Sequence, residues 1–221
     1  MSEGDDLDRI WSTPDQQTLV ERYDAWAEDY DEVHAGWGWG GPAWVAEALL
    51  SRADPHSVLD AGCGTGLVGA ELRDRGWTGR LVGVDLSAGM LARADARGGY
   101  DGLVTASLSA VPLPDASVGA VLASGVFTHG HVGSEAFPEL VRLTEPGGLI
   151  VITCRDDVWD DLAGGAAELV AAGAWTLVER SGPRPLHPGR EIDGGAQSVV
   201  IWRVGEDVGR APLKGRPSDG G

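Results

Sequence analysis

The chain contains little of what several classes of protein require. Its 221 residues include two cysteines and a single lysine, and acidic side chains outnumber basic ones to leave a net charge of −17. Two cysteines are too few for a disulfide framework, and we expect both to be small buried residues. A polyanion would meet no basic patch on such a surface. We therefore expect no nucleic acid as partner. Since no apolar run has the length of a membrane span, we expect no membrane as partner either.

The composition fits one domain of ordinary size. Hydrophobic residues make up 43% of the chain, which is enough for a sizeable core. The first residues, Met1 to Asp6, are acidic and polar, unlike a secretory signal peptide, so we expect a cytoplasmic protein. We expect it to be a monomer or a homodimer.

Strand-like and helix-like segments alternate along most of the chain, which predicts a mostly parallel sheet with helices on both faces. Strands are expected near residues 57–60, 81–84, 103–105, 118–123 and 149–154. Helices are expected over residues 42–50, 67–75 and 158–172. Two later β-rich runs, 175–180 and 198–203, predict an antiparallel hairpin at the sheet edge. The predicted fold class is therefore α/β.

The N-terminal part predicts a separate helical unit. Thr13-Pro14-Asp15-Gln16 fits a capping box, followed by a helix toward Tyr23 and a second helical stretch from about Ala25 to Val33. A stretch too rich in glycine for regular structure then runs from Gly36 to Pro42. We divide the chain into an N-terminal helical lid (1–45), a core domain (46–205) and a flexible tail (206–221).

The most informative stretch is a glycine-rich turn that follows an apolar run. Val58 and Leu59 are typical of the end of a buried strand, and Asp60 follows them. The glycines that come next let the backbone approach a ligand where a Cβ would collide. A helix is expected to begin at Leu67, and a helix N-terminus attracts polar or anionic groups. This arrangement predicts a cofactor site.

Two cofactors compete for this turn. Gly64-x-Gly66-x-x-Gly69 fits the dinucleotide fingerprint, and Asp85 lies where that motif places its ribose-binding acid. Asp60 would repel a pyrophosphate unless its pKa rose sharply, whereas it would attract an ammonium group. S-adenosylmethionine carries such a group, has no phosphate and offers a ribose diol to Asp85. The turn alone leaves both cofactors open.

Four motifs, in this order, resemble those of class I S-adenosylmethionine-dependent methyltransferases. They are Asp60-Ala61-Gly62-Cys63-Gly64-Thr65-Gly66, Val84-Asp85-Leu86-Ser87-Ala88-Gly89-Met90-Leu91, Val111-Pro112-Leu113-Pro114-Asp115 and Leu143-Thr144-Glu145-Pro146-Gly147-Gly148-Leu149. The resemblance implies a single Rossmann-like, seven-stranded, mostly parallel sheet, S-adenosyl-L-methionine as cofactor and methyl transfer as the activity. A narrower set, Tyr23-Asp24-x-Trp26 with Gly125-x-x-x-x-Gly130 and Pro138-Glu139-Leu140, resembles the methyltransferase-like subfamily named after the Williams-Beuren syndrome region.

The resemblance also implies roles for cofactor-binding residues. Asp60 is expected to orient the methionyl end and Asp85 to hold the ribose hydroxyls. Leu86 and Met90 are expected to enclose the adenine, although Met90 also fits an ordinary core position. Ser107 stands where the family often has an acidic residue. The predicted cofactor-binding set is Tyr23, Trp26, Tyr30, Asp60, Gly62, Cys63, Gly64, Thr65, Gly66, Asp85, Leu86, Met90, Ser107, Leu108 and Ser124.

Aromatic residues gather in the predicted lid. Tyr23, Trp26 and Tyr30 resemble lid residues that reach the carboxylate side of the cofactor, and their spacing equally fits the buried stripe of an amphipathic helix. Three tryptophans that follow, Trp37, Trp39 and Trp44, are candidates to line an aromatic substrate pocket. Core packing is the alternative for the last of them.

Methyl transfer needs alignment and exclusion of water more than it needs a base. Three histidines are the candidate catalytic residues that would face an acceptor, namely His129, His131 and His34. Exposed surface histidines are the alternative interpretation. We expect no metal site, because no third ligand accompanies the His-x-His pair.

The expected function is S-adenosylmethionine-dependent methyl transfer to a small-molecule acceptor, on oxygen, nitrogen or sulfur, by in-line displacement. One alternative is an NAD(P)-dependent oxidoreductase, which the dinucleotide fingerprint favours. Another is a non-catalytic S-adenosylmethionine-binding protein, which Ser107 and the lack of an obvious base leave open.

Overall fold

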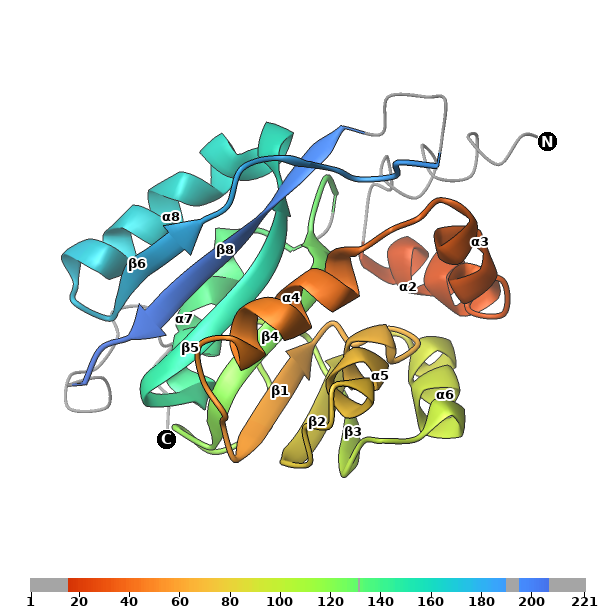
Figure 1. Cartoon of the computed structure of the whole chain (residues 1–221), viewed down its shortest axis with the longest axis horizontal. Coiled ribbons are helices and arrows are strands. Elements are labelled where there is room, and N and C mark those ends of the chain that lie inside the picture. The colour runs from red at the N-terminus through yellow and green to blue at the C-terminus, as the bar shows by residue number, and fades with distance from the viewer. Residues whose placement is uncertain (1–15, 131, 190–194, 207–221) are drawn as a thin grey trace.

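A computed structural model describes residues 16–130, 132–189 and 195–206. Its centre is a mixed sheet in the order β3-β2-β1-β4-β5-β8-β6, with a short strand β7 paired to β8 (Figure 1). The strands are β1 (Ser57–Ala61), β2 (Arg80–Asp85), β3 (Gly102–Thr105), β4 (Val118–Phe127), β5 (Thr144–Arg155), β6 (Trp175–Arg180), β7 (Arg184–Pro185) and β8 (Ala196–Val204). Strands β1 to β5 run parallel, and β8 runs antiparallel to both β5 and β6. The predicted α/β fold, with its C-terminal antiparallel strands, is confirmed. The sheet has eight strands where seven were predicted, because the short β7 also pairs with β8.

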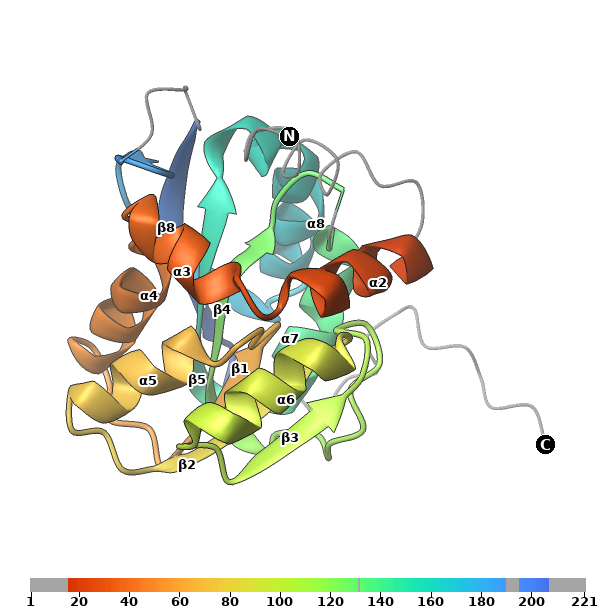
Figure 2. The same cartoon turned by 90° about the vertical axis from the view of Figure 1, so that its right-hand side faces the viewer.

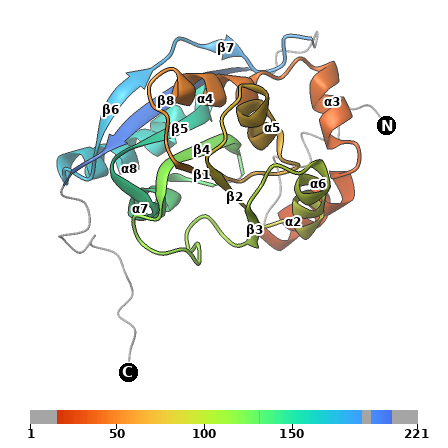
Figure 3. The same ribbon diagram turned by 60° about the horizontal axis from the view of Figure 1, so that its bottom comes forward.

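Helices cover both faces of the sheet (Figure 3). On one face lie α4 (Gly41–Leu50) and α5 (Leu67–Asp74), and on the other lie α7 (Phe137–Leu143) and α8 (Trp159–Ala171). Helix α6 (Ala88–Arg97) packs beside β2 and β3. Each face has its own apolar core. This double cover explains why β1 is buried along its whole length.

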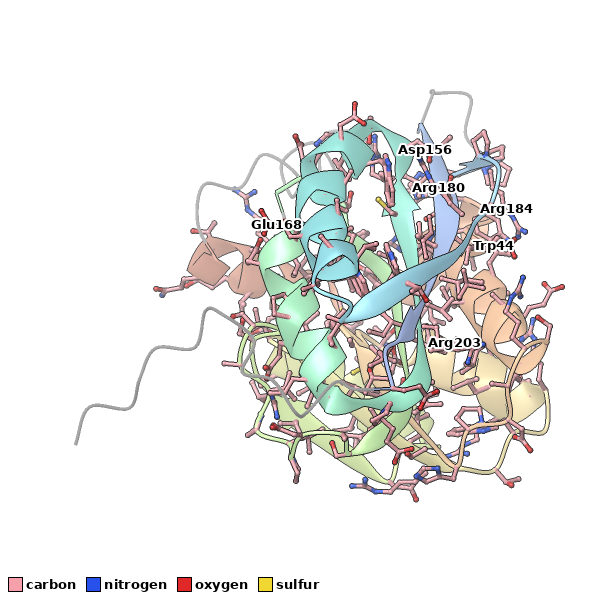
Figure 4. All side chains as sticks on the ribbon, turned by 90° about the vertical axis from the view of Figure 1, so that its left-hand side faces the viewer. Trp44, Asp156, Glu168, Arg180, Arg184 and Arg203 are labelled. Atoms are coloured by element: carbon pink, nitrogen blue, oxygen red, sulfur yellow. The ribbon has the colours of Figure 1, made fainter. Side chains whose placement is uncertain are left out.

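The C-terminal strands are held by stacked aromatic rings and by arginines at the edge. The indoles of Trp175 and Trp202 stack with their centroids 4.5 Å apart, and both are fully buried. On the outer side, the Arg184 guanidinium lies 4.9 Å from the ring centre of Trp44 on α4 (Figure 4). These contacts join β6 to β8 and β7 to α4.

Strand β4 continues beyond the end predicted from the sequence. The prediction ended it at Ala123, but β4 extends to Phe127, with a register irregularity between these two residues. Phe127 is buried in the core, so its burial keeps the strand in the sheet after the irregular segment. Gly125, at φ +74°, makes the bend. Residues 124–126 are thereby turned toward the edge where the parallel strands end.

Two short helices form the N-terminal unit. They are α2 (Gln16–Trp26) and α3 (Tyr30–Gly36), and they cross the edge at which the parallel strands end, with α6 beside α2 (Figure 2). The predicted boundary at residue 45 falls inside α4, whose Val45 and Leu49 are fully buried against the sheet. The predicted capping box at Thr13 and the tail beyond Glu206 lie outside the described residues.

Two single turns of 3₁₀ helix, Ser134–Ala136 and Asp156–Val158, complete the described elements. Within the described part of the chain, no helix combines the length and the apolar character needed to cross a membrane.

Candidate functional site

The glycine turn joins β1 to α5 at the carboxyl edge of the sheet. The amides of Gly62 and Cys63 donate to the carbonyl of Val84, at 2.8 and 3.0 Å, and so tie the turn to β2. Gly62 has a φ of +72°, and a Cβ there would lie 2.4 Å from Val126 Cγ2. Both the backbone conformation and the neighbour therefore require glycine at this position.

Asp85, at the end of β2, is held in place by backbone amides. Its Oδ2 accepts from Gly64 N and its Oδ1 accepts from Ser87 N, both at 2.9 Å. Burial raises the pKa of Asp85, and these amides act in the opposite direction. The sequence separates this carboxylate from the glycine turn, and the parallel pairing of β1 with β2 brings the two together.

Asp60 lies beneath the turn and is completely buried. Its Oδ2 accepts a hydrogen bond of 2.6 Å from the Tyr100 hydroxyl, and its Oδ1 has no hydrogen-bond partner among the described residues. Burial raises the pKa of Asp60 to about 7, the Tyr100 hydrogen bond lowers it, and the charge of Asp85 raises it. The charge argument against a pyrophosphate is therefore weaker than the sequence suggests, because this carboxyl is partly protonated near neutral pH.

Tyr100 also explains the third glycine of the dinucleotide fingerprint. A Cβ on Gly69 would lie 2.7 Å from both Cζ and Oη of Tyr100, and a Cβ on Gly66 would lie 3.1 Å from its Cε2. Gly83 on β2 makes room for the same ring, at 2.9 Å from Cε1. These glycines admit the tyrosine that reaches Asp60, so the fingerprint spacing has a packing explanation that needs no pyrophosphate.

A cavity of about 420 Å³ opens above the turn. Predicted cofactor residues that line it are Tyr23, Tyr30, Gly62, Gly64, Asp85, Leu86, Met90, Ser107, Leu108 and Ser124. Its wall includes backbone, a carboxylate, hydroxyls and apolar side chains. Ser107, which replaces the family's acid, shares a hydrogen bond of 2.9 Å with Ser109.

Five other predicted residues do not line this cavity. Asp60 lies beneath the turn, Cys63, Thr65 and Gly66 belong to the turn itself, and Trp26 lines a second, smaller cavity. Burial raises the pKa of the Cys63 thiol well above its usual value. The Thr65 hydroxyl donates to Asp31 at 2.5 Å. These residues support the turn, and the orienting role expected of Asp60 stays a prediction.

Several lining residues were missed from the sequence. Leu19 and Val20 come from α2, Ala106 follows β3, and Glu135 lies in the turn before α7. A sequence signal could have identified Leu19 and Val20, since they belong to the predicted helix that carries Tyr23. Glu135 had none, because nothing local indicates that the turn before α7 reaches the mouth of the cavity.

Polar contacts fix the lid over the cavity. Asp24 on α2 accepts from Ser87 Oγ and, at 2.9 Å, from Gly89 N at the start of α6. Asp31 on α3 accepts from the Thr65 hydroxyl and pairs with Arg97. Because these acids lie next to the lid tyrosines in sequence, they set where both tyrosines meet the cavity.

The second cavity, of about 50 Å³, adjoins the first, and Tyr23, Tyr30 and Gly125 line both. Its wall is largely aromatic, with Trp26, His34, Trp39, Phe127 and His187 among the lining residues. Polar lining comes from Thr128, Thr153, Arg155 and Gln197. The lid aromatics therefore pack against one another and also line the cavity wall. Their predicted contact with the cofactor stays a prediction.

His34 is the predicted catalytic candidate that reaches a cavity. It is buried, and its Nδ1 donates to the carbonyl of Tyr30 at 2.9 Å, which leaves Nε2 as the unprotonated nitrogen. Burial lowers the pKa of His34 to about 4, against the smaller raising effects of that hydrogen bond and of Asp31. The ring is therefore neutral near pH 7 and a weak base.

The other predicted acceptor-side residues lie elsewhere. His129 is half exposed and lies 3.1 Å from Asp157, outside both cavity linings. His131 lies outside the described residues. Among the tryptophans, Trp39 lines the smaller cavity, whereas Trp37 is buried against His187 and Trp44 faces Arg184. The described residues contain no group of three or more His, Cys, Asp or Glu suited to a metal ion.

The residues around the larger cavity fit S-adenosylmethionine. Leu86, Met90 and Leu108 supply apolar surface for a purine, and Asp85 supplies a carboxylate for vicinal hydroxyls. Asp60 Oδ1, which has no hydrogen-bond partner among the described residues, lies outside the cavity lining. No basic side chain lines this cavity among the described residues.

Residues 59–152 match the family model described as a methyltransferase domain. Over these residues, which make up less than half of the chain, the protein is similar to a methyltransferase domain. The match covers β1 to most of β5, and thus the turn, Asp85 and most of the larger cavity. S-adenosylmethionine is the methyl donor that the family implies.

Relatives with curated names agree with this domain. The chain is 42% identical over 148 residues to Methyltransferase-like protein 27 of Homo sapiens, a match that covers 64% of this chain and 60% of the relative. It is 37% identical over 138 residues to Malonyl-[acyl-carrier protein] O-methyltransferase of Serratia marcescens, covering 61% of this chain and 50% of the relative. The chain thus spans only half to three fifths of the length of these relatives.

Solved structures share the fold of the domain. A chain from the complex between the Haloferax volcanii Trm112 methyltransferase activator and a methyltransferase superposes with a TM-score of 0.64. The match covers 84% of this chain and 97% of that chain at 16% identity. At this identity the likeness shows the fold alone, that is, the arrangement of the strands and helices.

Proposed function

We propose that this protein transfers a methyl group from S-adenosylmethionine to a small-molecule acceptor, on oxygen, nitrogen or sulfur, by in-line displacement. The observation that carries the proposal is the pairing of two cavities across Tyr23, Tyr30 and Gly125. The larger one has the lining of a nucleoside site, and the smaller one would receive the acceptor. Alignment across that junction is the main contribution that such a reaction needs.

Asp85 is the residue on which we expect cofactor binding to depend most. Its two oxygens are already oriented by Gly64 N and Ser87 N, so the carboxylate is fixed before any ligand arrives. We propose that it accepts from the ribose hydroxyls, while Leu86 and Met90 enclose the purine. The bound cofactor supplies the activated methyl carbon.

The lid residues have a different role in this proposal. Tyr23 and Tyr30 form the wall between the cavities, and we propose that they exclude water from the reacting atoms. His34 would accept a hydrogen bond through Nε2 without taking up a proton at neutral pH, because burial keeps its pKa near 4. A strong general base is therefore not part of the proposal.

Calorimetric titration with S-adenosylhomocysteine tests the cofactor site. We expect binding to the wild-type chain and no binding of NAD under the same conditions. Asp85→Asn should weaken S-adenosylhomocysteine about tenfold or more, since it removes a charged hydrogen-bond acceptor. Asp95→Asn is the matched control, because Asp95 is an exposed acid of α6. Binding of NAD without S-adenosylhomocysteine would refute the proposal and favour the oxidoreductase.

The narrower resemblance also belongs to the proposal. The 42% identity to Methyltransferase-like protein 27 supports membership of that methyltransferase-like subfamily. The relatives named as O-methyltransferases support oxygen among the three acceptor atoms. A cytoplasmic location and a monomeric or homodimeric state stay predictions.

A further inference from the structure

The smaller cavity has a size that limits what can enter it. Its volume is about 50 Å³, whereas an apolar cavity that admits benzene measures about 150 Å³. An aromatic ring is therefore too large for the cavity in this closed arrangement. A group of a few heavy atoms fits, provided that the rest of the acceptor lies toward the larger cavity or the solvent.

The charges around the smaller cavity favour an anion. Its lining contains no aspartate or glutamate among the described residues, and its one arginine is Arg155. The guanidinium of Arg155 is mostly buried and bonds to Asp157, which does not line the cavity. Asp157 compensates part of this charge from outside the lining. Inside the cavity, where no described carboxylate faces the guanidinium, a cationic amine would be repelled and an anion attracted.

Gln197 adds a hydrogen-bond donor that lacks a partner. It lies on β8 directly opposite Arg155 of β5, is 2% exposed and lines the cavity. Its Nε2 is buried and has no hydrogen-bond partner among the described residues. A buried donor left unsatisfied is costly, and retaining one in a cavity wall points to a ligand atom that accepts from it.

We propose that the methyl acceptor is a carboxylate, that it enters the smaller cavity, and that Gln197 Nε2 donates to one of its oxygens. This inference rests on the proposed function and names the acceptor class for it. The arginine compensates the charge of the carboxylate, and the aromatic wall keeps water away. Gln197 is then a residue that selects the acceptor, although it belongs to no recognisable sequence motif.

The chemistry of such an acceptor matches the groups present. A carboxylate oxygen donates an electron pair to the methyl carbon and forms a C–O bond. The S–C bond breaks, its electron pair stays on sulfur, and the products are a methyl ester and a neutral thioether. No proton moves, so the reaction needs no base. This agrees with a neutral His34, the predicted catalytic histidine that lines a cavity among the described residues.

The first experiment measures binding without requiring the natural acceptor. Trp26 and Trp39 line the cavity, so tryptophan fluorescence should respond to its occupation. Acetate, propionate and malonate are titrated into the S-adenosylhomocysteine complex at constant ionic strength, beside acetamide and propionamide as uncharged analogues. We expect saturable changes with the acids and at least about tenfold weaker responses with the amides.

The variant that tests the donor is Gln197→Leu, which has similar volume and lacks the amide. It should weaken the acids about tenfold or more and leave S-adenosylhomocysteine affinity unchanged. Gln17→Leu, the same substitution at an exposed position of α2, should change neither. Thermal unfolding is measured for both variants, and Gln197→Leu should be no less stable, since it removes an unsatisfied donor.

Methyl transfer is then measured with radiolabelled donor and an extended set of acids, amines and thiols. Alkali-labile label, released as methanol, identifies a methyl ester and supports the proposal. Alkali-stable label, equal binding of acids and amides, no response to either series, or unchanged acid binding by Gln197→Leu would overturn it. Failure of S-adenosylhomocysteine to bind would instead refute the proposed function, so the two failures are distinguishable.

Discussion

The buried pair of Asp60 and Tyr100 makes a pH-dependent prediction for the substitution Tyr100→Phe. The change removes the hydroxyl that donates to Asp60 Oδ2 at 2.6 Å and leaves both carboxyl oxygens without a partner. Because this hydrogen bond stabilises the charged form, its loss should raise the pKa of Asp60 further above the wild-type value of about 7. The ring itself stays, so the packing against Gly66 and Gly69 is retained.

The sign of the effect follows from proton linkage. The folded state holds a proton on Asp60 between its ordinary pKa of 3.8 and about 7, so this group makes stability fall as pH rises through that window. The fall amounts to on the order of 4 kcal/mol in the wild type, taking about 1.4 kcal/mol for each pKa unit. In Tyr100→Phe the window extends to higher pH.

The difference between variant and wild type is therefore small in acid and large in alkali. Near pH 5 the carboxyl is neutral, and losing the hydroxyl should cost about 1 kcal/mol. Near pH 9 the wild-type carboxylate is charged, and the cost should be about 1.5–3 kcal/mol. Urea unfolding from pH 5 to pH 9 measures both values, and taking the difference cancels the titration of groups shared by the two proteins.

Tyr30→Phe is the matched control, because the Tyr30 hydroxyl has no hydrogen bond to a carboxylate among the described residues. Its effect on the free energy of unfolding should not change between pH 5 and pH 9. If Tyr100→Phe also showed a constant difference, Asp60 would not titrate in this range, and our account of the buried pair would be wrong.

Two further substitutions test the packing of the turn and the attachment of the lid. Gly69→Ala should destabilise the protein by about 1–3 kcal/mol, because its Cβ would lie 2.7 Å from Tyr100. The control Gly164→Ala, in the open interior of α8, should stabilise the protein slightly. Thermal unfolding compares the two variants, and equal effects would contradict the packing argument. Asp31→Ala removes two polar contacts between α3 and the core, so it should cost less than about 1 kcal/mol of global stability while amide exchange in residues 16–36 accelerates. Unchanged exchange in that segment would show that these contacts do not hold the lid.

The part of the larger cavity around the glycine turn could be largely predicted, because its residues are local in the sequence. The turn after β1 and the acid at the end of β2 each follow a recognisable apolar strand, and parallel pairing brings them to one edge. Asp85, Gly62 and Gly64 accordingly lie at the cavity. Asp60 shows the limit of this reasoning. Its position along the chain was evident, but its depth below the turn depends on Tyr100, which lies forty residues further on.

The acceptor half could not be predicted in the same way, because tertiary structure alone assembles it. Its wall joins the lid, the irregular end of β4, the end of β5 and β8, so Trp39, Thr128, Arg155 and Gln197 share no local pattern. Histidine chemistry drew attention to His129, but that side chain pairs with Asp157 outside the cavities. Neighbouring strands β5 and β8 are what place Gln197 opposite Arg155. If the smaller cavity receives the acceptor as we propose, substitutions on β8 and the lid should change the acceptor without touching the residues around Asp85.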